Sequence, residues 1–418
     1  MSTPRNWESR TLGSLGTVLR GKGIKRSDVR TIGIPCVRYG ELYTEYRNYM
    51  STTRSFVDAE IAATSQPISK GDLLFAGSGE TREEIGMCAA YVGDSQAVAG
   101  GDIVIVRGGT FNPIFLASLC NSPSVVRQKA RSSQGDAVVH IYPSGISDIV
   151  VALPPKAEQD TIANAILDAD TLIATLERLI AKKQAIKQGL VQQLLTGRTR
   201  LPGFTEAWSK IRLGNHVSYV KTVALSRAQL DRQSPLKYLH YGDIHTRSSI
   251  LLDAAIEEMP RANVSLAARA GQLRRGDLVF ADASEDPEGV GKSIEIADTL
   301  DTGVVPGLHT IAARFDKSVL ADGFKAYLQF IPSFRDQLLR LAAGTKVLAT
   351  TRSYISSITL TLPAVAEQNA IAQTLHDSER EIEALRVRLL KAQDMKTGMM
   401  QQLLAGRCHL PLELPHEH

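Results

Sequence analysis

Two stretches of the chain place apolar residues at alternating intervals of four and three, which predicts a long helix with one apolar stripe. The first stretch follows LPPKAEQDTIANAIL, which begins at Leu153, and the second follows LPAVAEQNAIAQTLH, which begins at Leu362. Each covers about 40 residues, or about 60 Å at 1.5 Å per residue. Because a lone apolar stripe needs a partner, we expect the two helices to pair as an antiparallel coiled coil.

Matching positions form the stripe of each predicted helix, and lysines interrupt both stripes. Lys183, Lys187 and Lys396 stand where a coiled coil prefers leucine or isoleucine. Either their stems pack in the stripe while their ammonium groups reach solvent, or the stripe opens there toward an anionic partner. The stripes comprise Ile162, Ile166, Ala169, Ile173, Leu176, Ile180, Lys183, Lys187, Leu190 and Leu194, and Ile371, Leu375, Ser378, Ile382, Leu385, Leu389, Ala392, Lys396, Met399 and Leu403.

Both predicted helices carry the same terminal residues. Pro154 or Pro155 suits a helix start, because the N–H that proline lacks would be unbonded there. Glu158 falls in the first turn, where the helix dipole favours an anion. Gly197 suits the left-handed residue that ends a helix. The second copy has Pro363, Glu367 and Gly406 at the corresponding places.

The chain consists of two sequence repeats. A shift of 209 residues superimposes the two helical segments without a gap, and the match weakens toward the N-terminus of each unit. The C-terminal part of each repeat is therefore closely similar in the two copies, whereas the N-terminal part, here called the variable front, has diverged. The matched segments include QQLLTGR (192–198) with QQLLAGR (401–407), GDLLFAGSGE (71–80) with GDLVFADASE (276–285), YGEL (39–42) with YGDI (241–244), and WESRTLG (7–13) with WSKIRLG (208–214).

The variable fronts predict short strands with some helix. Strand-like runs occur at 33–42, 71–77, 100–108 and 146–154, and helical periodicity occurs at 114–130 and at 324–342, where Pro332 should interrupt it. We therefore predict an α+β fold in which two α/β globules are joined by two long helices, with internal two-fold pseudo-symmetry. The expected domains are 1–152, the first helix 153–198, the second globule 199–361, the second helix 362–407 and a tail 408–418.

Composition narrows the class of protein without fixing it. At 418 residues the chain exceeds one ordinary core, and 43% hydrophobic with 22% charged residues is typical of soluble globular proteins. A formal net charge of +4 permits a nucleic-acid partner but does not require one. The N-terminus has no signal-peptide pattern and no apolar run spans a membrane, so we expect a cytoplasmic protein. The four separated cysteines suggest buried reduced thiols, with neither disulfides nor zinc.

Catalytic motifs are missing from the sequence. The segment DPEGVGKS (286–293) ends like a phosphate-binding loop, but Asp286 stands where glycine is required, and its carboxylate would repel a phosphate. The chain also lacks the adenine-methyltransferase motif N-P-P-[YF], H-E-x-x-H and G-x-S-x-G. We therefore expect a non-catalytic chain with no metal and no cofactor of its own. Two unlike globules on long helices suit two separated half-sites of a duplex, whose groove repeats every ~34–36 Å.

The doubled motif LPPKAEQ…QQLLTGR and LPAVAEQ…QQLLAGR resembles the specificity subunit of Type I restriction–modification systems over essentially the whole chain. The resemblance implies that each variable region is a target-recognition domain reading one half of a bipartite, asymmetric site in double-stranded DNA. It implies that the helices set the spacer and dock two modification subunits, which use S-adenosylmethionine to methylate adenine N6.

It further implies restriction subunits that use ATP and Mg, so that the assembled complex would be an adenine-N6 DNA methyltransferase and an ATP-dependent endonuclease. The alternative is a two-headed protein-interaction scaffold that binds no nucleic acid.

Candidate DNA contacts lie in the variable regions, on basic loops and on loops that differ between otherwise matching strands. Lysine and arginine suit phosphates, and arginine or histidine can also reach base edges. The alternative for each residue is ordinary solvated charge. The candidates are Lys22, Lys25, Arg26, Arg38, Arg82 and Arg131 in the first unit, and Lys221, Arg227, His240, Lys292, Lys346 and Arg352 in the second.

Overall fold

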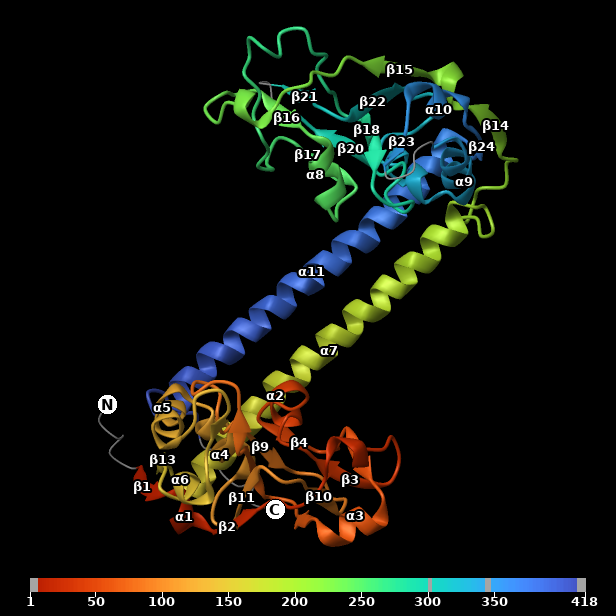
Figure 1. The fold of residues 1–418 in the computed structure, drawn as a ribbon. Coiled ribbons are helices and arrows are strands. Elements are labelled where there is room, and N and C mark those ends of the chain that lie inside the picture. Colours follow the sequence, from red (N-terminus) through yellow and green to blue (C-terminus); the bar gives the residue numbers. More distant parts are fainter. Residues whose placement is uncertain (1–6, 300–302, 343–346, 412–418) are drawn as a thin grey trace. The chain divides into compact units, whose positions relative to one another are not determined.

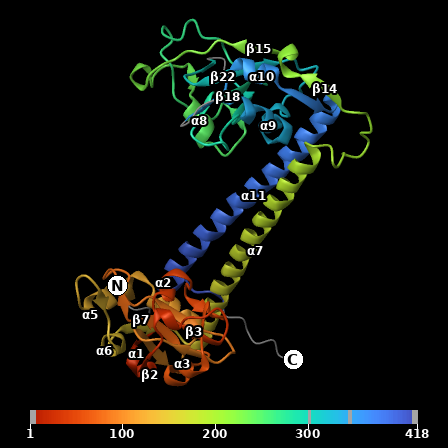
Figure 2. The same cartoon turned by 45° about the vertical axis from the view of Figure 1, so that its right-hand side comes forward.

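The computed structural model describes residues 7–299, 303–342 and 347–411. The chain divides into two compact units, Met1–Glu177 with Arg388–His418, and Arg178–Val387. The division crosses both long helices, so each unit holds one globular domain and a stretch of each helix (Figures 1 and 2).

The first domain is built on a five-stranded sheet that is antiparallel except at one edge, where β4 runs parallel to β9. In spatial order its strands are β2 (Thr17–Arg20), β11 (Ile103–Arg107), β7 (Leu73–Ala76), β9 (Cys88–Tyr91) and β4 (Tyr49–Met50). A four-stranded sheet contains β5 (Ser55–Val57), β3 (Ile34–Val37), β10 (Ala97–Ala99) and β6 (Gln66–Ile68). Two strand pairs are β1 (Glu8–Thr11) with β13 (Val150–Leu153), and β8 (Ser78–Gly79) with β12 (Val139–His140). The helices are α1 (Leu12–Leu15), η1 (Arg26–Asp28), α2 (Glu41–Thr44), α3 (Ala59–Thr64), α4 (Pro113–Cys120), α5 (Pro123–Ser132) and α6 (Pro143–Ser147).

The second domain repeats the strand order of the first in its main sheet. These strands are β15 (Val217–Val220), β22 (Thr310–Phe315), β18 (Leu278–Ala281), β20 (Ser293–Asp298) and β17 (Leu251–Asp253). Three strand pairs are β14 (Ser209–Arg212) with β24 (Thr359–Leu362), β16 (Lys237–Leu239) with β21 (Val304–Pro306), and β19 (Ala283–Ser284) with β23 (Leu348–Ala349). The helices are η2 (Leu213–His216), η3 (Arg227–Gln229), α8 (Tyr241–Thr246), η4 (Lys325–Phe330), α9 (Pro332–Leu341) and α10 (Arg352–Ser357).

All four predicted strand runs contain a strand, but two of the predicted boundaries are wrong. The run 33–42 ends as a strand at Val37 and turns into α2, and the run 146–154 begins inside α6. The predicted break at Pro332 is confirmed, since η4 ends before it and α9 begins at it. The helical periodicity over 114–130 is confirmed but is divided between two helices, α4 and α5, with Pro123 at the first position of the second.

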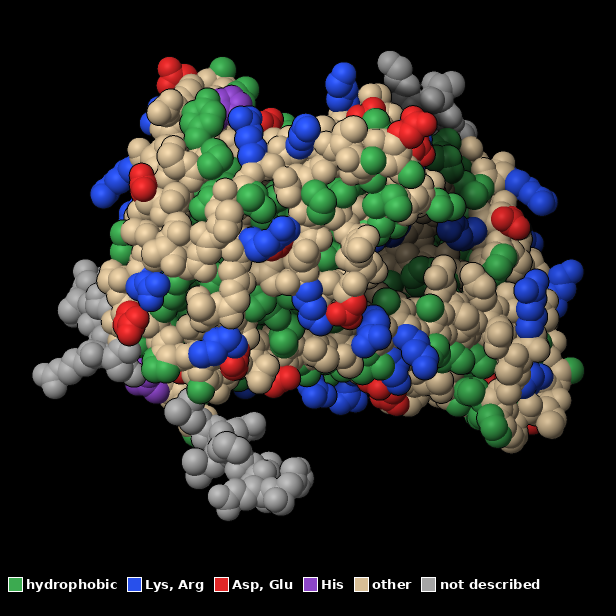
Figure 3. All heavy atoms as spheres, turned by 90° about the horizontal axis from the view of Figure 1, so that it is seen from below, with side chains coloured by type: hydrophobic (Ala, Val, Ile, Leu, Met, Phe, Trp, Pro, Cys, Tyr) green, Lys and Arg blue, Asp and Glu red, His purple; other side chains and the backbone are tan. Residues whose placement is uncertain are grey.

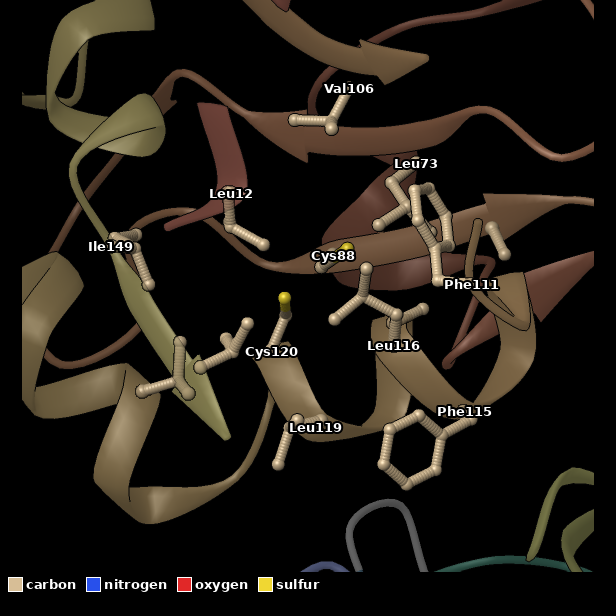
Figure 4. Close-up of a cluster of buried hydrophobic side chains, with 14 of the residues drawn as sticks. Leu12, Leu73, Cys88, Val106, Phe111, Phe115, Leu116, Leu119, Cys120 and Ile149 are labelled. Carbon is tan, nitrogen blue, oxygen red and sulfur yellow. The ribbon is translucent and has the colours of Figure 1, made fainter. Parts of the chain in front are cut away.

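The main sheet of the first domain is buried on both faces. Leu73 and Phe75 of β7 point into one apolar cluster, and the alternating Leu74 and Ala76 point into another. Figure 4 shows the first cluster, in which Leu116 and other side chains of α4 face the sheet. Burial on both faces explains why these strands read as continuous apolar runs.

Each domain holds an equivalent ion pair, in which the buried Asp of the shared GDLL and GDLV segments meets a partly exposed Arg. Asp72 binds the Arg107 guanidinium through both carboxylate oxygens, at 2.9 and 2.6 Å. Asp277 binds Arg314 in the same way, at 2.8 and 2.7 Å. Both carboxylates also accept a backbone N–H three residues earlier, so the shared Asp is structural.

The predicted long helices are α7 (Lys156–Leu194) and α11 (Val365–Leu403), 39 residues each. Pro155 and Pro363 lie just before the two helices and not in their first turns, whereas the other expected terminal features are present. Glu158 and Glu367 lie in the first turns. Gly197 and Gly406 follow the last turns with φ of 68° and 61°, the left-handed conformation that suits glycine.

The lysines of the two stripes pair with carboxylates of the other long helix. Both members of each pair lie in the same unit. Lys187 pairs with Glu379, and 209 residues further on Lys396 pairs with Asp170 at 2.5 Å. Lys183 also pairs with Glu381, at 2.7 Å. Neither proposed interpretation of these lysines described such pairs. The order of these contacts shows that the two helix stretches run antiparallel within the second unit.

The Glu-Gln of the repeated motif anchors the start of each helix to its own domain. Gln159 accepts from the backbone N–H of Asn112 (2.9 Å) and donates to the Pro154 carbonyl (2.9 Å). Gln368 repeats this arrangement with Ala321 and Pro363, both at 2.9 Å. Both glutamine side chains are buried, so each helix start is fixed against its domain.

The preceding glutamate of each motif contacts the segment that follows the other helix. Glu367 makes a two-pronged ion pair with Arg200, which follows α7. The Nδ1 atom of His409, which follows α11, lies 2.8 Å from a Glu158 oxygen. Arg200 and His409 are themselves 209 residues apart, so the same contact occurs once in each unit.

Only the second domain, within the described residues, buries a lysine–glutamate cluster. Lys325 is fully buried, with its Nζ 2.5 Å from Asp322 and 3.7 Å from Glu295. Burial raises the pKa of Glu295 to about 7, against the opposing effect of Lys325 and of two backbone N–H donors. Ionisation of this carboxylate therefore destabilises the folded domain.

This raised pKa predicts a loss of stability as the pH rises. Glu295 is protonated in the folded chain below about pH 7 but ionises near 4.5 when unfolded, so stability falls between these values, by on the order of 3 kcal/mol. Glu295→Gln should remove this part of the pH dependence. Because the chain has two tryptophans, a Trp7→Phe background leaves Trp208 to report denaturant unfolding of the second unit. An equal loss between pH 5 and 8 with and without Glu295→Gln would contradict the assignment.

Candidate nucleic-acid interface

The basic loop of each domain contains a short 3-10 helix closed by a capping box. In the first domain η1 holds Arg26, with Lys22 and Lys25 just before it, and all three side chains are exposed. In the second domain η3 holds Arg227, and Lys221 lies six residues earlier, both exposed. Among the described residues, no ion pair occupies any of these five cations, so all are available to phosphates.

The shared YGEL and YGDI segments form the start of a short helix in each domain. The Glu41 carboxylate accepts from the backbone N–H of Arg38 and pairs with its guanidinium, both at 3.1 Å. Asp243 accepts from the N–H of His240 at 2.9 Å. Glu41 and Asp243 therefore cap the starts of the two short helices. The sequence analysis did not predict this role, although both units have an acidic residue at this position. Arg38 is partly buried and already has a carboxylate partner.

His240 lies among aromatic and basic groups. Its Nδ1 accepts from the backbone N–H of Gly242 (3.1 Å), so the other ring nitrogen of the neutral imidazole carries the proton. Burial lowers the pKa of His240, and the nearby His309 and Arg227 lower it further against the opposing effect of Asp243. The charge of Arg227, another predicted contact, thus reaches His240.

In the first domain the structure brings two predicted loops together. Strand β8 precedes the loop that holds Arg82, and its partner β12 follows the loop after Arg131. The Arg82 guanidinium donates to the Gly135 carbonyl at 3.2 Å and lies 3.6 Å from Asp136. Arg131 is exposed in the last turn of α5.

Lys292 lines a hollow of about 950 Å³ in the second domain. Its Nζ donates to the His245 carbonyl at 2.5 Å, so its ammonium group already has one protein partner. Arg352 is exposed at the start of α10, with its guanidinium 5.5 Å from the centre of the Tyr219 ring. Lys346 lies outside the described residues.

Two residues that the sequence reading passed over occupy equivalent turns. Asp102 precedes β11 and His309 precedes β22, with φ of 58° and 55°. Both side chains are about half exposed, 45% and 51%. The only sequence signal was a glycine-containing turn before a matching strand, where the two units carry different polar residues.

Charges of both signs occur on the face of the molecule drawn in Figure 3. Figure 3 shows Lys and Arg side chains scattered among acidic ones on the face that it draws, which agrees with a net charge of only +4. Across residues 7–299, 303–342 and 347–411, no group of His, Cys, Asp or Glu is arranged to hold a metal ion. In the same ranges no helix has the length and apolar character needed to cross a bilayer.

The cysteines are all free thiols. Cys36, Cys88 and Cys120 are buried as expected, whereas Cys408 is exposed, contrary to the expectation of four buried thiols. The exposed thiol follows α11 and is outside both apolar cores.

No family model matches the chain. Among curated proteins, a putative Type I restriction enzyme MjaX specificity subunit of Methanocaldococcus jannaschii is 22% identical, with 97% of this chain and 94% of that protein covered. The Type I restriction enzyme MjaVIII specificity subunit of the same organism is 21% identical with the same coverage. The EcoKI specificity subunit of Escherichia coli is 24% identical over 68% of this chain and 58% of that protein.

Solved structures agree with the sequence comparisons. The HsdS subunit from Thermoanaerobacter tengcongensis has a TM-score of 0.54 at 16% identity, with 98% of this chain and 99% of that one covered. The Type I S subunit from M. genitalium has a TM-score of 0.55 at 11% identity, with 96% and 98% covered. The resemblance predicted from the doubled motif is therefore confirmed, and the chain is a homologue of the specificity subunits of Type I restriction–modification systems.

Proposed function

We propose that this chain gives a Type I restriction–modification complex its DNA sequence specificity, with each domain reading one half of a bipartite, asymmetric site. The observation that carries the proposal is a shared frame that carries unlike polar residues. The main sheets have the same strand order, and both domains hold the same Asp–Arg pair with a buried carboxylate. The side chains around Arg38 and His240 nevertheless differ, so two domains of one shape can bind different bases.

The helices are proposed to form an antiparallel coiled coil that sets the spacer and docks two modification subunits. The Lys187–Glu379 and Lys396–Asp170 pairs support internal two-fold pseudo-symmetry, because they exchange equivalent positions of the two helices. Under this proposal the domains are 1–152 and 199–361, the helical segments are 153–198 and 362–407, and a tail follows at 408–418.

Catalysis is assigned to partner subunits. The modification subunits would use S-adenosylmethionine to methylate adenine N6, and the restriction subunits would use ATP and Mg. The phosphate-loop-like segment supports this assignment, because the Asp286 carboxylate bonds its own loop, with the N–H of Gly289 at 2.6 Å. The complex is expected to act in the cytoplasm. A protein-interaction scaffold is not favoured, because the homologues are specificity subunits.

Exchange of one variable region tests the function directly. A chain whose residues 1–152 come from another specificity subunit, assembled with its modification subunits, should methylate a site with one changed half. The other half and the spacer should be unchanged, because the second domain and both helices are retained. Sequencing of methylated adenines in treated DNA measures all three. A change in both halves would contradict the proposal that each domain reads its own half.

The basic loops predict a measurable dependence on salt. Lys22→Gln with Arg26→Gln should lower the slope of log binding constant against log salt by about two, since each phosphate contact contributes about 0.9. Lys70→Gln is a matched control, because Lys70 already pairs with Asp94 at 2.8 Å. Titration of the complex with duplex DNA between low and moderate salt measures the slope. An unchanged slope in the double variant would exclude these phosphate contacts.

A paired deletion tests the helices as a spacer. Removal of residues 173–179 and 382–388 takes the same heptad from both helices and keeps the phase of the stripe. Each helix shortens by about 10 Å, so the gap between half-sites should shorten by up to about three base pairs. The methylated motif should keep both halves. An unchanged gap in an assembled, active complex would show that the helices do not set the spacing.

A further inference from the structure

The turns that precede β11 and β22 have the same construction in the two domains. At Asp102 the backbone is left-handed, and the residue's carbonyl accepts from the N–H of Gly77 at 2.6 Å. At His309 the backbone is left-handed too, and the carbonyl accepts from the N–H of Asp282 at 3.1 Å. Both donors directly follow the neighbouring strand, β7 or β18, so the central sheet fixes the position of each residue.

A side chain at these positions has an energetic cost. Residues other than glycine seldom adopt positive φ; Asp and His do so more often than most, but each instance still costs on the order of 1 kcal/mol. Glycine would satisfy the turn, and the first domain already has Gly100 and Gly101 immediately before Asp102. Each domain nevertheless keeps a polar residue there, and the two residues differ in chemistry. This combination points to use of the side chain and not of the backbone alone.

In the first domain this turn is bonded to the basic loop. The N–H of Lys22 donates to the Ala99 carbonyl at 3.2 Å, and the N–H of Gly101 donates to the Gly23 carbonyl at 2.9 Å. The Asp102 carboxylate lies 3.7 Å from the Arg20 guanidinium, which can orient it. Asp102 is therefore held beside the cations proposed to contact phosphates.

In the second domain the turn has equivalent neighbours. The N–H of Val223, in the basic loop, donates to the Pro306 carbonyl at 3.0 Å. The His309 ring meets the Tyr241 ring edge-on at 5.3 Å, and its Nδ1 lies 3.2 Å from Asp282. His309 also lines the hollow that Lys292 lines.

We propose that Asp102 and His309 are specificity-determining residues that contact base edges, one in each half-site. This inference rests on the proposed function. A carboxylate repels phosphates but accepts hydrogen bonds from the amino groups of cytosine and adenine, so Asp102 selects a base with an exocyclic amino group. With Nδ1 held by Asp282, Nε2 of His309 is the ring atom left to bond a base.

Glycine substitutions test the inference without disturbing the turn, because glycine adopts positive φ freely. Asp102→Gly should relax discrimination at one base pair of one half-site by about tenfold to a hundredfold. His309→Gly should do the same in the other half-site. Asp102→Asn keeps the size of the side chain but exchanges an acceptor for a donor, so it should shift the preferred base. Full-length variants assembled with modification subunits are scored on DNA pools randomised at one position of the site at a time.

Ile24→Gly is the matched control, since Ile24 has φ of 56° in the adjacent basic loop but an apolar side chain. It should leave every base preference unchanged. Unchanged base preferences in both Asp102→Gly and His309→Gly would overturn the inference. A loss of affinity that is equal for all sequences, with a smaller salt slope, would also overturn it, because that result marks a phosphate contact. If the unsubstituted complex shows no sequence preference, the proposed function itself fails, so the two failures are distinguishable.

Discussion

The buried Glu-Gln pair at the start of each long helix is the constraint on which the rest of the structure depends. Gln159 bonds both the domain backbone and the turn before its helix, so the helix leaves the domain at a fixed place. The neighbouring Glu158 contacts His409, which follows the other helix. An unsatisfied buried amide would cost on the order of 1–3 kcal/mol, so the residue pair tolerates little change. The repetition of this pair, with Gln368 and Glu367, is why the motif occurs twice.

Specificity and architecture are separated along the sequence. The long helices, the Asp72–Arg107 ion pair and its counterpart in the second domain repeat because they hold the frame. The exposed residues on that frame are free to diverge, as at Asp102 and His309, because no apolar core depends on them. A duplicated chain of this kind can acquire a new half-site in one domain without disturbing the other.

The two long helices were predictable from sequence because their signals are local. Heptad spacing, first-turn glutamates and Gly197 with Gly406 act within one or two turns, and α7 and α11 have the expected length. The ion pairs of Lys187 and Lys396 were not predicted, because their partners lie about 200 residues away in the sequence. The break before Pro123 was missed because helical periodicity continues across it.

The candidate site was harder to predict, because a basic residue in a loop looks the same in sequence whether it is free or paired. Arg38 has a buried partner that only the folded turn reveals, and positive φ at Asp102 and His309 has no sequence signature beyond a nearby glycine. The central claim is that two domains with one frame read two different half-sites. Its most direct test is a genome-wide map of methylated adenines in the host, with and without this chain. The account predicts one chain-dependent motif with two unlike halves at a fixed gap, and a continuous or palindromic motif would contradict it.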